Sequence, residues 1–140
     1  MNSPARKPIR IIISEEPTAQ ARARVAFCNG KVHSYTPEKS LNAQNAIRVR
    51  LVRYQDRMFP KGVAVKLTVC FHRTKSKWMP KYETLPYRKP DLDNMCKLVQ
   101  DAMVGYLIED DSQITQLSAR KRWTDKETGY ITLKIEEDTP

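Results

Sequence analysis

The chain has 140 residues and a formal net charge of +9 at pH 7. This length predicts a single domain, and an apolar content of 40% excludes a disordered chain. The charge predicts a polyanionic partner, most commonly nucleic acid, and does not exclude a basic binding protein without catalytic activity. The sequence contains no apolar run near the roughly 20 residues of a membrane helix, and its N-terminus lacks the apolar core of a signal peptide, so we expect a cytoplasmic protein.

The first part of the chain is predicted to form strands. Residues 9–13 are rich in β-branched side chains and predict a first strand. Residues 22–27 and 31–35 flank Asn29 and Gly30, and an Asn-Gly pair supplies the positive φ angles of a type I′ turn. We therefore expect a β-hairpin after the first strand.

Two helices are predicted further along the chain. Thr36 and Pro37 suit the N-cap and N1 positions of the first helix. Its apolar stripe has helical spacing and consists of Ile47, Leu51, Tyr54 and Met58. The second helix is expected at about residues 94–104, and its apolar face consists of Met95, Val99 and Met103.

Three further strands complete the predicted fold. Alternating apolar residues predict a strand at 63–71, and residues 114–123 and 130–135 predict two closing strands. The resulting order β-ββ-α-β-α-β-β is that of an α+β (mixed α/β) fold. We expect one compact domain over residues 1–140, with a mixed β-sheet and two main helices.

The cysteines and histidines carry little functional signal. Cys28, Cys70 and Cys96 are widely spaced and form no C-x-x-C pair, so we expect reduced thiols rather than a zinc site or a disulfide. His33 and His72 lie far apart in the sequence, which argues against a histidine-based nuclease.

The segment from residue 73 to residue 89 is basic and aromatic. Trp78, Tyr82 and Tyr87 alternate with basic residues that outnumber the single acidic one, Glu83. Such a loop can pair with phosphates and stack on unpaired bases; the alternative is a solvated loop whose rings pack on the core. Two further arginines share one face of the predicted hairpin. The residues expected to bind DNA are Arg22, Arg24, Lys75, Lys77, Arg88 and Lys89.

An acidic motif follows this segment. Asp91 and Asp93 are two residues apart, so in an extended segment both carboxylates project to one side and can reach one ion. Pro90 disfavours a helix before them, and Asp93 or Asn94 suits the N-cap of the helix that follows. We therefore expect the pair beside a helix N-terminus, where its oxygens can bind Mg²⁺.

Other charged residues fit the same site. Lys97 lies one helical turn after Asp93, where its ammonium can bind a phosphate, orient water or offset transition-state charge. Asp110-Asp111 can supply a third carboxylate. Acidic clustering in a basic chain favours metal-assisted phosphodiester hydrolysis, since a protein that only held DNA would gain nothing from it. The alternative is a solvated ion-pair stripe of Asp93, Lys97 and Asp101.

The acidic motifs and their spacing resemble the RusA family of Holliday-junction resolvases, which are small and often encoded by phages or prophages. The family signature D-x-D-N-x-x-K…D…D-D-x-x-[IV] is matched tightly between residues 90 and 114. The likeness is looser at Glu16-Pro17, Arg22-Ala23-Arg24 and Thr36-Pro37. Two features depart from the family: Pro90 stands where some members carry a basic residue, and the loop at residues 73–89 is long.

The resemblance implies a function and a site. Asp91, Asp93 and Asp111 match metal-binding carboxylates, and the implied catalytic residues are these three aspartates with Lys97. The implied cofactor is Mg²⁺, with Mn²⁺ as a substitute; Asp101 would support helix packing or Lys97. The implied protein is a homodimer, since a four-way junction is two-fold symmetric and is nicked twice. We expect a Mg²⁺-dependent endodeoxyribonuclease that resolves Holliday junctions in DNA recombination and repair by paired symmetric hydrolysis.

Two alternative functions fit parts of the sequence. The Asp-x-Asp motif also occurs in the Mn²⁺-nucleotide site of glycosyltransferases, but this chain is short for that class, which has no need of a charge of +9. A non-catalytic protein that binds branched DNA is the second alternative; it would bind junctions in EDTA and leave them uncut in Mg²⁺.

Overall fold

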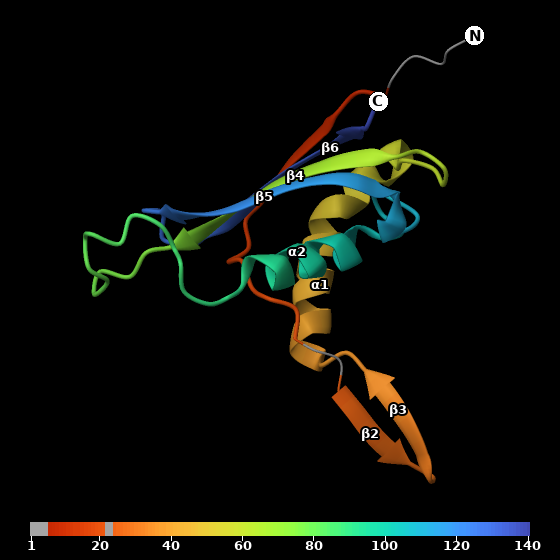
Figure 1. Ribbon diagram of the computed structural model, residues 1–140, viewed down its shortest axis with the longest axis horizontal. Coiled ribbons are helices and arrows are strands. Elements are labelled where there is room, and N and C mark those ends of the chain that lie inside the picture. Colours follow the sequence, from red (N-terminus) through yellow and green to blue (C-terminus); the bar gives the residue numbers. More distant parts are fainter. Residues whose placement is uncertain (1–5, 22–23) are drawn as a thin grey trace.

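The computed structural model describes residues 6–21 and 24–140, with Arg24 described in its backbone only. The body of the protein is a four-stranded mixed β-sheet with two helices against one face (Figure 1). The strands are β1 (Ile9–Ile13), β4 (Val65–Thr74), β5 (Ile114–Thr124) and β6 (Tyr130–Glu137), in the spatial order β1-β6-β4-β5. The predicted mixed α+β fold is confirmed.

The pairing of the strands brings distant segments together. β6 lies between β1 and β4 and runs antiparallel to both, with Leu133 opposite Ile11 on one side and Val69 on the other. β4 and β5 run parallel, with Val69 opposite Ala119. Parallel neighbours need a long crossover connection, and residues 75–113, which include the second helix, provide it.

One face of the sheet forms the core. Successive side chains of a strand point to opposite sides, and in β4 the alternate residues Val65, Leu67, Val69 and Phe71 are almost completely buried. Each such side chain contributes roughly 1.5–3 kcal/mol relative to an exposed one. The opposite face of the sheet carries the more polar residues of each strand.

Helices α1 (Glu38–Leu51) and α2 (Leu92–Met103) cover the core face. The α2 residues Met95, Val99 and Met103 are fully buried, as the predicted apolar face requires. Arg48 of α1 donates hydrogen bonds to the carbonyl oxygens of Asp101 (3.0 Å) and Ala102 (3.4 Å), two acceptors at the C-terminal end of α2. No helix in the described part of the chain is long and apolar enough to span a membrane.

The first helix is shorter than predicted. Pro37 is its N-cap rather than N1, and the α-helix ends at Leu51, where a 3₁₀ helix, η1 (Val52–Arg57), replaces it. The stripe through Tyr54 and Met58 is therefore not one α-helical face. The physical reason lies just beyond, because Phe59 is fully buried and its amide donates to the Leu107 carbonyl at 2.8 Å. The α-helix therefore gives way to the tighter 3₁₀ helix, which brings Phe59 to its buried position.

The predicted hairpin is confirmed. β2 (Arg24–Cys28) and β3 (Lys31–Tyr35) pair antiparallel and project from the body of the protein (Figure 1). Asn29 and Gly30 have φ angles of 52° and 73°, as a type I′ turn requires. Every side chain of β3 is exposed. The predicted DNA-binding residue Arg22 lies outside the described residues.

Glu16 connects the end of β4 to the turn between β5 and β6. Its carboxylate accepts hydrogen bonds from the amide of Thr74 (3.2 Å) and the amide of Gly129 (2.5 Å). A Cβ atom at position 129 would lie 2.5 Å from the carbonyl oxygen of His72, so this close approach requires glycine. The hydrogen bonds of Glu16 thus hold together the end of the sheet at Thr74, where the basic loop begins.

Candidate active site

The aspartates of the first acidic motif lie at the N-terminal end of α2. Asp91 is the N-cap, with extended backbone angles (φ −72°, ψ 141°), and Asp93 lies in the first helical turn. The Asp93 carboxylate accepts a hydrogen bond from the Asn94 amide at 2.9 Å. The expectation of an extended Asp91–Asp93 segment with the N-cap at Asp93 or Asn94 is wrong, because the helix begins at Leu92. Both carboxylates are exposed where the helix dipole favours negative charge.

Lys97 is held by a chain of contacts that starts in the core. Its ammonium lies 3.6 Å from the carboxylate of Asp101. The same oxygen of Asp101 accepts a hydrogen bond from Gln20 at 2.8 Å, and Gln20 accepts one from the buried Gln44 of α1, also at 2.8 Å. Asp101 therefore lies where it can support Lys97, one of its two predicted roles.

The second acidic motif forms a turn. Asp111 opens a short 3₁₀ helix, η2 (Asp111–Gln113), directly before β5. Asp110 is its N-cap, and the hydrogen bond from the Ser112 amide lowers the pKa of Asp110, as does its contact with Asp111. The pKa of Asp111 is raised by that contact, by burial and by the charges of Asp110 and Asp101, and Lys97 opposes the rise. The elements α2 and η2 contact each other, so Asp111 feels the charges of Lys97 and Asp101.

The predicted metal ligands lie on α2 and on η2 and do not form a single cluster. Among the described residues, no three His, Cys, Asp or Glu side chains are grouped so that they could hold a metal ion. Asp91 and Asp93 stand at the N-terminus of α2, whereas Asp111 is influenced by Lys97 and Asp101 further along. The helical rise between residues 93 and 101 is about 12 Å.

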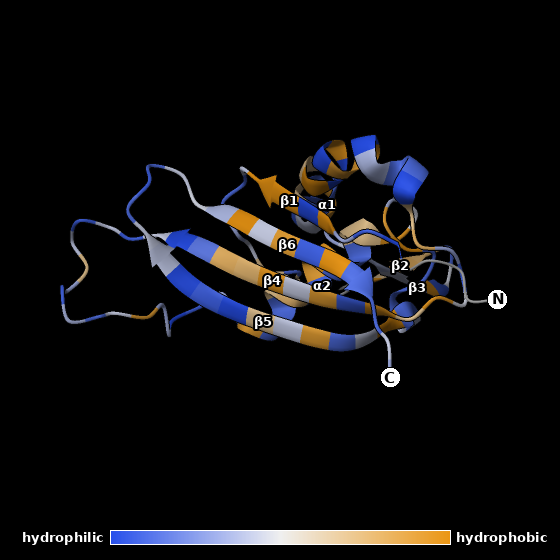
Figure 2. Ribbon diagram, turned by 90° about the horizontal axis from the view of Figure 1, so that it is seen from above, coloured by the Kyte–Doolittle hydropathy of each residue, from blue (hydrophilic) through white to orange (hydrophobic). Residues whose placement is uncertain are grey.

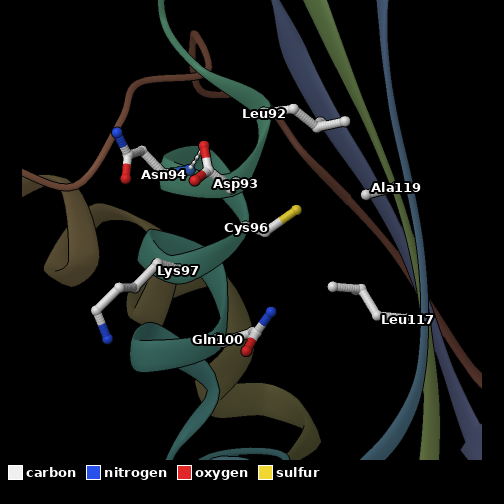
Figure 3. A pocket seen from close by; sticks show the side chains of 8 residues that line it. All are labelled: Leu92, Asp93, Asn94, Cys96, Lys97, Gln100, Leu117 and Ala119. Atoms are coloured by element: carbon white, nitrogen blue, oxygen red, sulfur yellow. Dashed lines mark hydrogen bonds between the residues drawn. The ribbon is translucent and has the colours of Figure 1, made fainter.

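A groove of about 760 Å³ separates α2 from β5. Figure 3 shows Leu92 and Cys96 pointing from α2 toward Ala119 and Leu117 of β5, while Lys97 extends away from the strand. Asp93 also lines the groove. The charged face of α2 therefore borders an open groove that a substrate can reach.

The three cysteines differ in their exposure. All three cysteines are free: Cys28 is exposed, Cys70 is partly buried and Cys96 is buried. Burial, together with the negative charge of Asp93, raises the pKa of Cys96 to about 11. Cys96 is thus a neutral thiol at physiological pH and serves as part of the wall of the groove.

The basic loop between β4 and α2 is anchored by Glu83. The side chain of Glu83 is buried (the residue is 4% exposed), and its carboxylate lies 2.5 Å from the guanidinium of Arg88. The ammonium of Lys75 donates a hydrogen bond to the Glu83 carbonyl at 2.7 Å. Two predicted DNA-binding residues, Lys75 and Arg88, thus hold the loop together, whereas Lys77 and Lys89 are exposed without such a contact among the described residues.

The aromatic residues of the loop project into solvent. Trp78 is 91% exposed, Tyr82 is 82% exposed and Tyr87 is 69% exposed. The alternative in which these rings pack on the core is therefore wrong. Figure 1 shows the loop reaching beyond the end of the sheet, on the side from which the chain enters α2.

Sequence reasoning missed Lys121 of β5. Its ammonium donates hydrogen bonds to the carbonyl oxygens of Arg88 (2.8 Å) and Pro90 (3.0 Å), the residues that lead into Asp91. These partners lie more than 30 residues away in the sequence, so no local motif reveals the contact. One sequence feature points to this contact: Lys121 shares a face of β5 with Ala119 and Trp123, and both of these neighbours are partly buried.

Comparison with known proteins identifies the family of the chain. The family model for endodeoxyribonuclease RusA matches residues 15–136. The chain is 30% identical over 130 residues to the crossover junction endodeoxyribonuclease rusA of Lactococcus phage r1t, an alignment that covers 89% of this chain and 93% of that protein. It is 29% identical over 127 residues to the uncharacterized protein YqaN of Bacillus subtilis (strain 168), an alignment that covers 84% of this chain and 89% of that protein. The chain therefore belongs to the RusA family and is an endodeoxyribonuclease.

Proposed function

We propose that this endodeoxyribonuclease resolves four-way DNA junctions by paired symmetric hydrolysis of phosphodiesters, with Mg²⁺ or Mn²⁺ as cofactor. The observation that carries the proposal is the face of α2 on which Asp93, Lys97 and Asp101 follow one another at single-turn spacing, near Asp91 and Asp111. The phage relative's name, a crossover junction endodeoxyribonuclease, supports the same class of substrate.

The donor set fits a magnesium ion. Asp91, Asp93 and Asp111 offer carboxylate oxygens, and Mg²⁺ takes few ligands from protein and keeps several waters. The pKa of Asp111 is raised by its hydrogen bond with Asp110, then by burial and by the negative charges of Asp110 and Asp101, and a divalent cation would offset those charges. A bound ion would lower the pKa of a water molecule and stabilise charge on the scissile phosphate.

Lys97 has the role of holding that phosphate. Its side chain is 61% exposed, so a DNA strand can reach the ammonium, and Asp101 with Gln20 limits the directions in which it points. A cation fixed in this way stabilises the negative charge that develops on the phosphate oxygens without having to reorganise.

The basic residues outside this face would bind the DNA arms. Lys77 and Lys89 are exposed on the loop that leads into α2, and Arg24 lies in β2 of the projecting hairpin. Lys75 and Arg88 add positive charge while they order the loop. Contacts of this kind with phosphates give affinity that depends on salt and not on sequence.

The proposal includes a homodimer. A four-way junction is two-fold symmetric, and a C₂ dimer with one site per chain presents two sites to two opposed strands. Paired symmetric nicks are the expected product of such an arrangement, and a monomeric nuclease would leave single nicks.

Cleavage of a synthetic immobile four-way junction in Mg²⁺ tests the proposal. We expect paired symmetric nicks by the wild-type protein, an intact linear duplex of matched sequence, and no cleavage by Asp93→Asn. Asp125→Asn, in the exposed turn before β6, removes the same charge elsewhere and should leave cleavage unchanged. Tight junction binding in EDTA without cleavage in Mg²⁺ or Mn²⁺ would contradict the proposal and favour a protein that only binds branched DNA.

A further inference from the structure

The sheet has a second face that no helix of the described chain covers. Figure 2 looks onto it, with α2 behind the sheet. Because Ile9, Ile11 and Ile13 of β1 and the alternate residues of β4 and β6 point into the core, their neighbours point outward. We call this the outer sheet face; its basic residues are Arg10, Lys66, Arg120, Arg122 and Lys134.

We propose that the outer sheet face binds the sugar-phosphate backbone of a DNA duplex arm, on the side of the sheet opposite α2. The inference rests on the chain's being a DNA-cleaving enzyme and does not depend on the four-way junction as substrate. It assigns a DNA contact to residues that lie neither on the α2 face with Asp93, Lys97 and Asp101 nor on the basic loop.

Strand register arranges the side chains of this face in rows. One row across β1, β6, β4 and β5 reads Arg10, Lys134, Thr68 and Ser118, and the next reads Ile12, Thr132, Cys70 and Arg120. Arg10 and Arg120 thus lie on the two edge strands, Lys134 lies beside Arg10 on β6, and the shorter side chains of Thr68, Thr132 and Cys70 lie between them. A groove of about 400 Å³ lies between them and is lined by Arg10, Arg120, Lys134, Thr68 and Thr132 among others.

The cations of the outer sheet face have few acidic partners among the described residues. Arg10 is directly opposite Lys134, a cross-strand pair of like charges whose Cβ atoms are about 5 Å apart and which destabilises a sheet. Lys134 also lies 3.5 Å from Glu136, the one acidic residue at an outward position of the four strands. Among the described residues, Arg10, Arg120 and Arg122 form no ion pair. A bound anion would remove this repulsion.

The pKa values of two residues on this face, His72 and Cys70, respond to the positive charges around them. The pKa of His72 is lowered first by burial and then by the charges of Lys126 and Arg120. The pKa of Cys70 is raised by burial, and Arg120 and Arg122 oppose that rise. The Lys126 ammonium also lies 4.6 Å from the ring centroid of Tyr130, which stacks on His72. Cations from β5 and from the β5–β6 turn therefore lie close to the outward side chains of β4 and to the first residue of β6.

DNA backbone matches this chemistry better than a second copy of the chain does. Guanidinium groups bind phosphate in a bidentate manner, and threonine hydroxyls add hydrogen bonds to phosphate oxygens. A second copy carries the same net charge of +9 and would bring like charges together. Charge complementarity therefore favours a polyanion.

Salt-dependent binding of a labelled linear duplex in EDTA tests the inference. Removing one cation that pairs with a phosphate should reduce the slope of log K against log salt by about 0.9. We expect this reduction for Arg10→Gln and Arg120→Gln singly and roughly twice the reduction for the double variant. Lys39→Gln, an exposed residue of α1, is the matched control and should leave the slope unchanged. An unchanged slope in the double variant would overturn the inference.

A local readout separates DNA binding from other uses of the face. The imidazole resonances of His72 should shift when duplex is added to the wild-type protein and stay in place in the double variant. Unchanged DNA affinity with an altered sedimentation coefficient in the double variant would instead assign the face to an interface between two chains and overturn the inference. If the wild type cuts no junction, the proposed function fails, and the duplex measurement still decides this inference.

Discussion

The ammonium of Lys97 lies 3.6 Å from the carboxylate of Asp101, one helical turn further along α2. An exposed pair of this kind contributes only about 0–1 kcal/mol to stability. The pair matters because it orients the side chain of Lys97. Gln20 donates a hydrogen bond to the same carboxylate oxygen of Asp101 and so holds that oxygen in place. The pair therefore sets the direction in which the Lys97 ammonium points from α2.

Replacing Asp101 tests this positioning. Asp101→Asn should lower kcat for junction cleavage roughly 10-fold, a modest part of the 10²-fold loss that a 1 Å misplacement can cause, with little change in KM. In a double-mutant cycle, Asp101→Asn should add nothing to the loss caused by Lys97→Ala, because both act through the same ammonium. Additive losses would contradict a role through Lys97.

Lys121 is expected to position Asp91 through the backbone. Lys121→Met keeps the length of the side chain and removes both hydrogen bonds to the carbonyls of Arg88 and Pro90. We expect a loss of roughly 1–3 kcal/mol in unfolding free energy and a fall in kcat of about 10-fold. Lys121→Arg, which keeps a donor, should recover most of the activity; equal losses in both variants would argue against the hydrogen bonds.

The anchor of the basic loop should be visible in proteolysis. Glu83→Gln removes the charge-assisted contact with Arg88 and should cost roughly 1–3 kcal/mol of unfolding free energy. Trypsin should then cut faster after Lys77 and Lys81, since the loop opens more often. Glu127→Gln, in the exposed turn between β5 and β6, is the control and should show wild-type rates. Unaltered cleavage in Glu83→Gln would mean that the anchor lies elsewhere.

Asp111 should destabilise the metal-free protein at neutral pH. Its folded pKa is raised, so stability is lost as pH rises from the ordinary aspartate value of about 3.9 through the folded value. Asp111→Asn should therefore raise Tm by roughly 1–3 °C at pH 7 and leave it unchanged at pH 3.5. Thermal unfolding in EDTA at both pH values checks this, with Asp125→Asn as the control; a lower Tm at pH 7 would contradict the sign.

The cysteines should differ sharply in reactivity. Cys28 is exposed in the hairpin, whereas Cys96 is buried with its pKa raised to about 11, so few Cys96 thiolates exist at pH 8. A thiol reagent should show one fast phase that disappears in Cys28→Ser. Mass spectrometry after brief labelling should find Cys96 unmodified, and early labelling of Cys96 would show that the groove wall opens.

Local patterns predict the parts of the fold that local physics determines. Asn29-Gly30 specifies the hairpin turn because few residues adopt two positive φ angles in succession. The apolar spacing of Met95, Val99 and Met103 locates α2 because helical periodicity is also a local property. The end of α1 at Leu51 escapes such patterns, because it depends on the burial of Phe59 against residues near position 107.

The sequence signature selects the residues of the candidate site, but local patterns predict their geometry less well. The signature locates the acidic residues and Lys97, but the predicted helix start lies two residues after the actual one at Leu92, which moves Asp93 from an extended segment to a helical turn. Gln20, Gln44 and Lys121 reach the site only through tertiary contacts between segments far apart in the sequence. No periodicity in the chain encodes those contacts.

The central place of β6 has a consequence for biosynthesis. Residues 130–137 leave the ribosome after β1, β4 and β5, yet they separate β1 from β4 in the finished sheet. Until they emerge, β1 has no strand to pair with and half of the core face is missing. A nascent chain therefore cannot complete the sheet that packs against α2 until β6 has been synthesised, and cutting of DNA has to await that point.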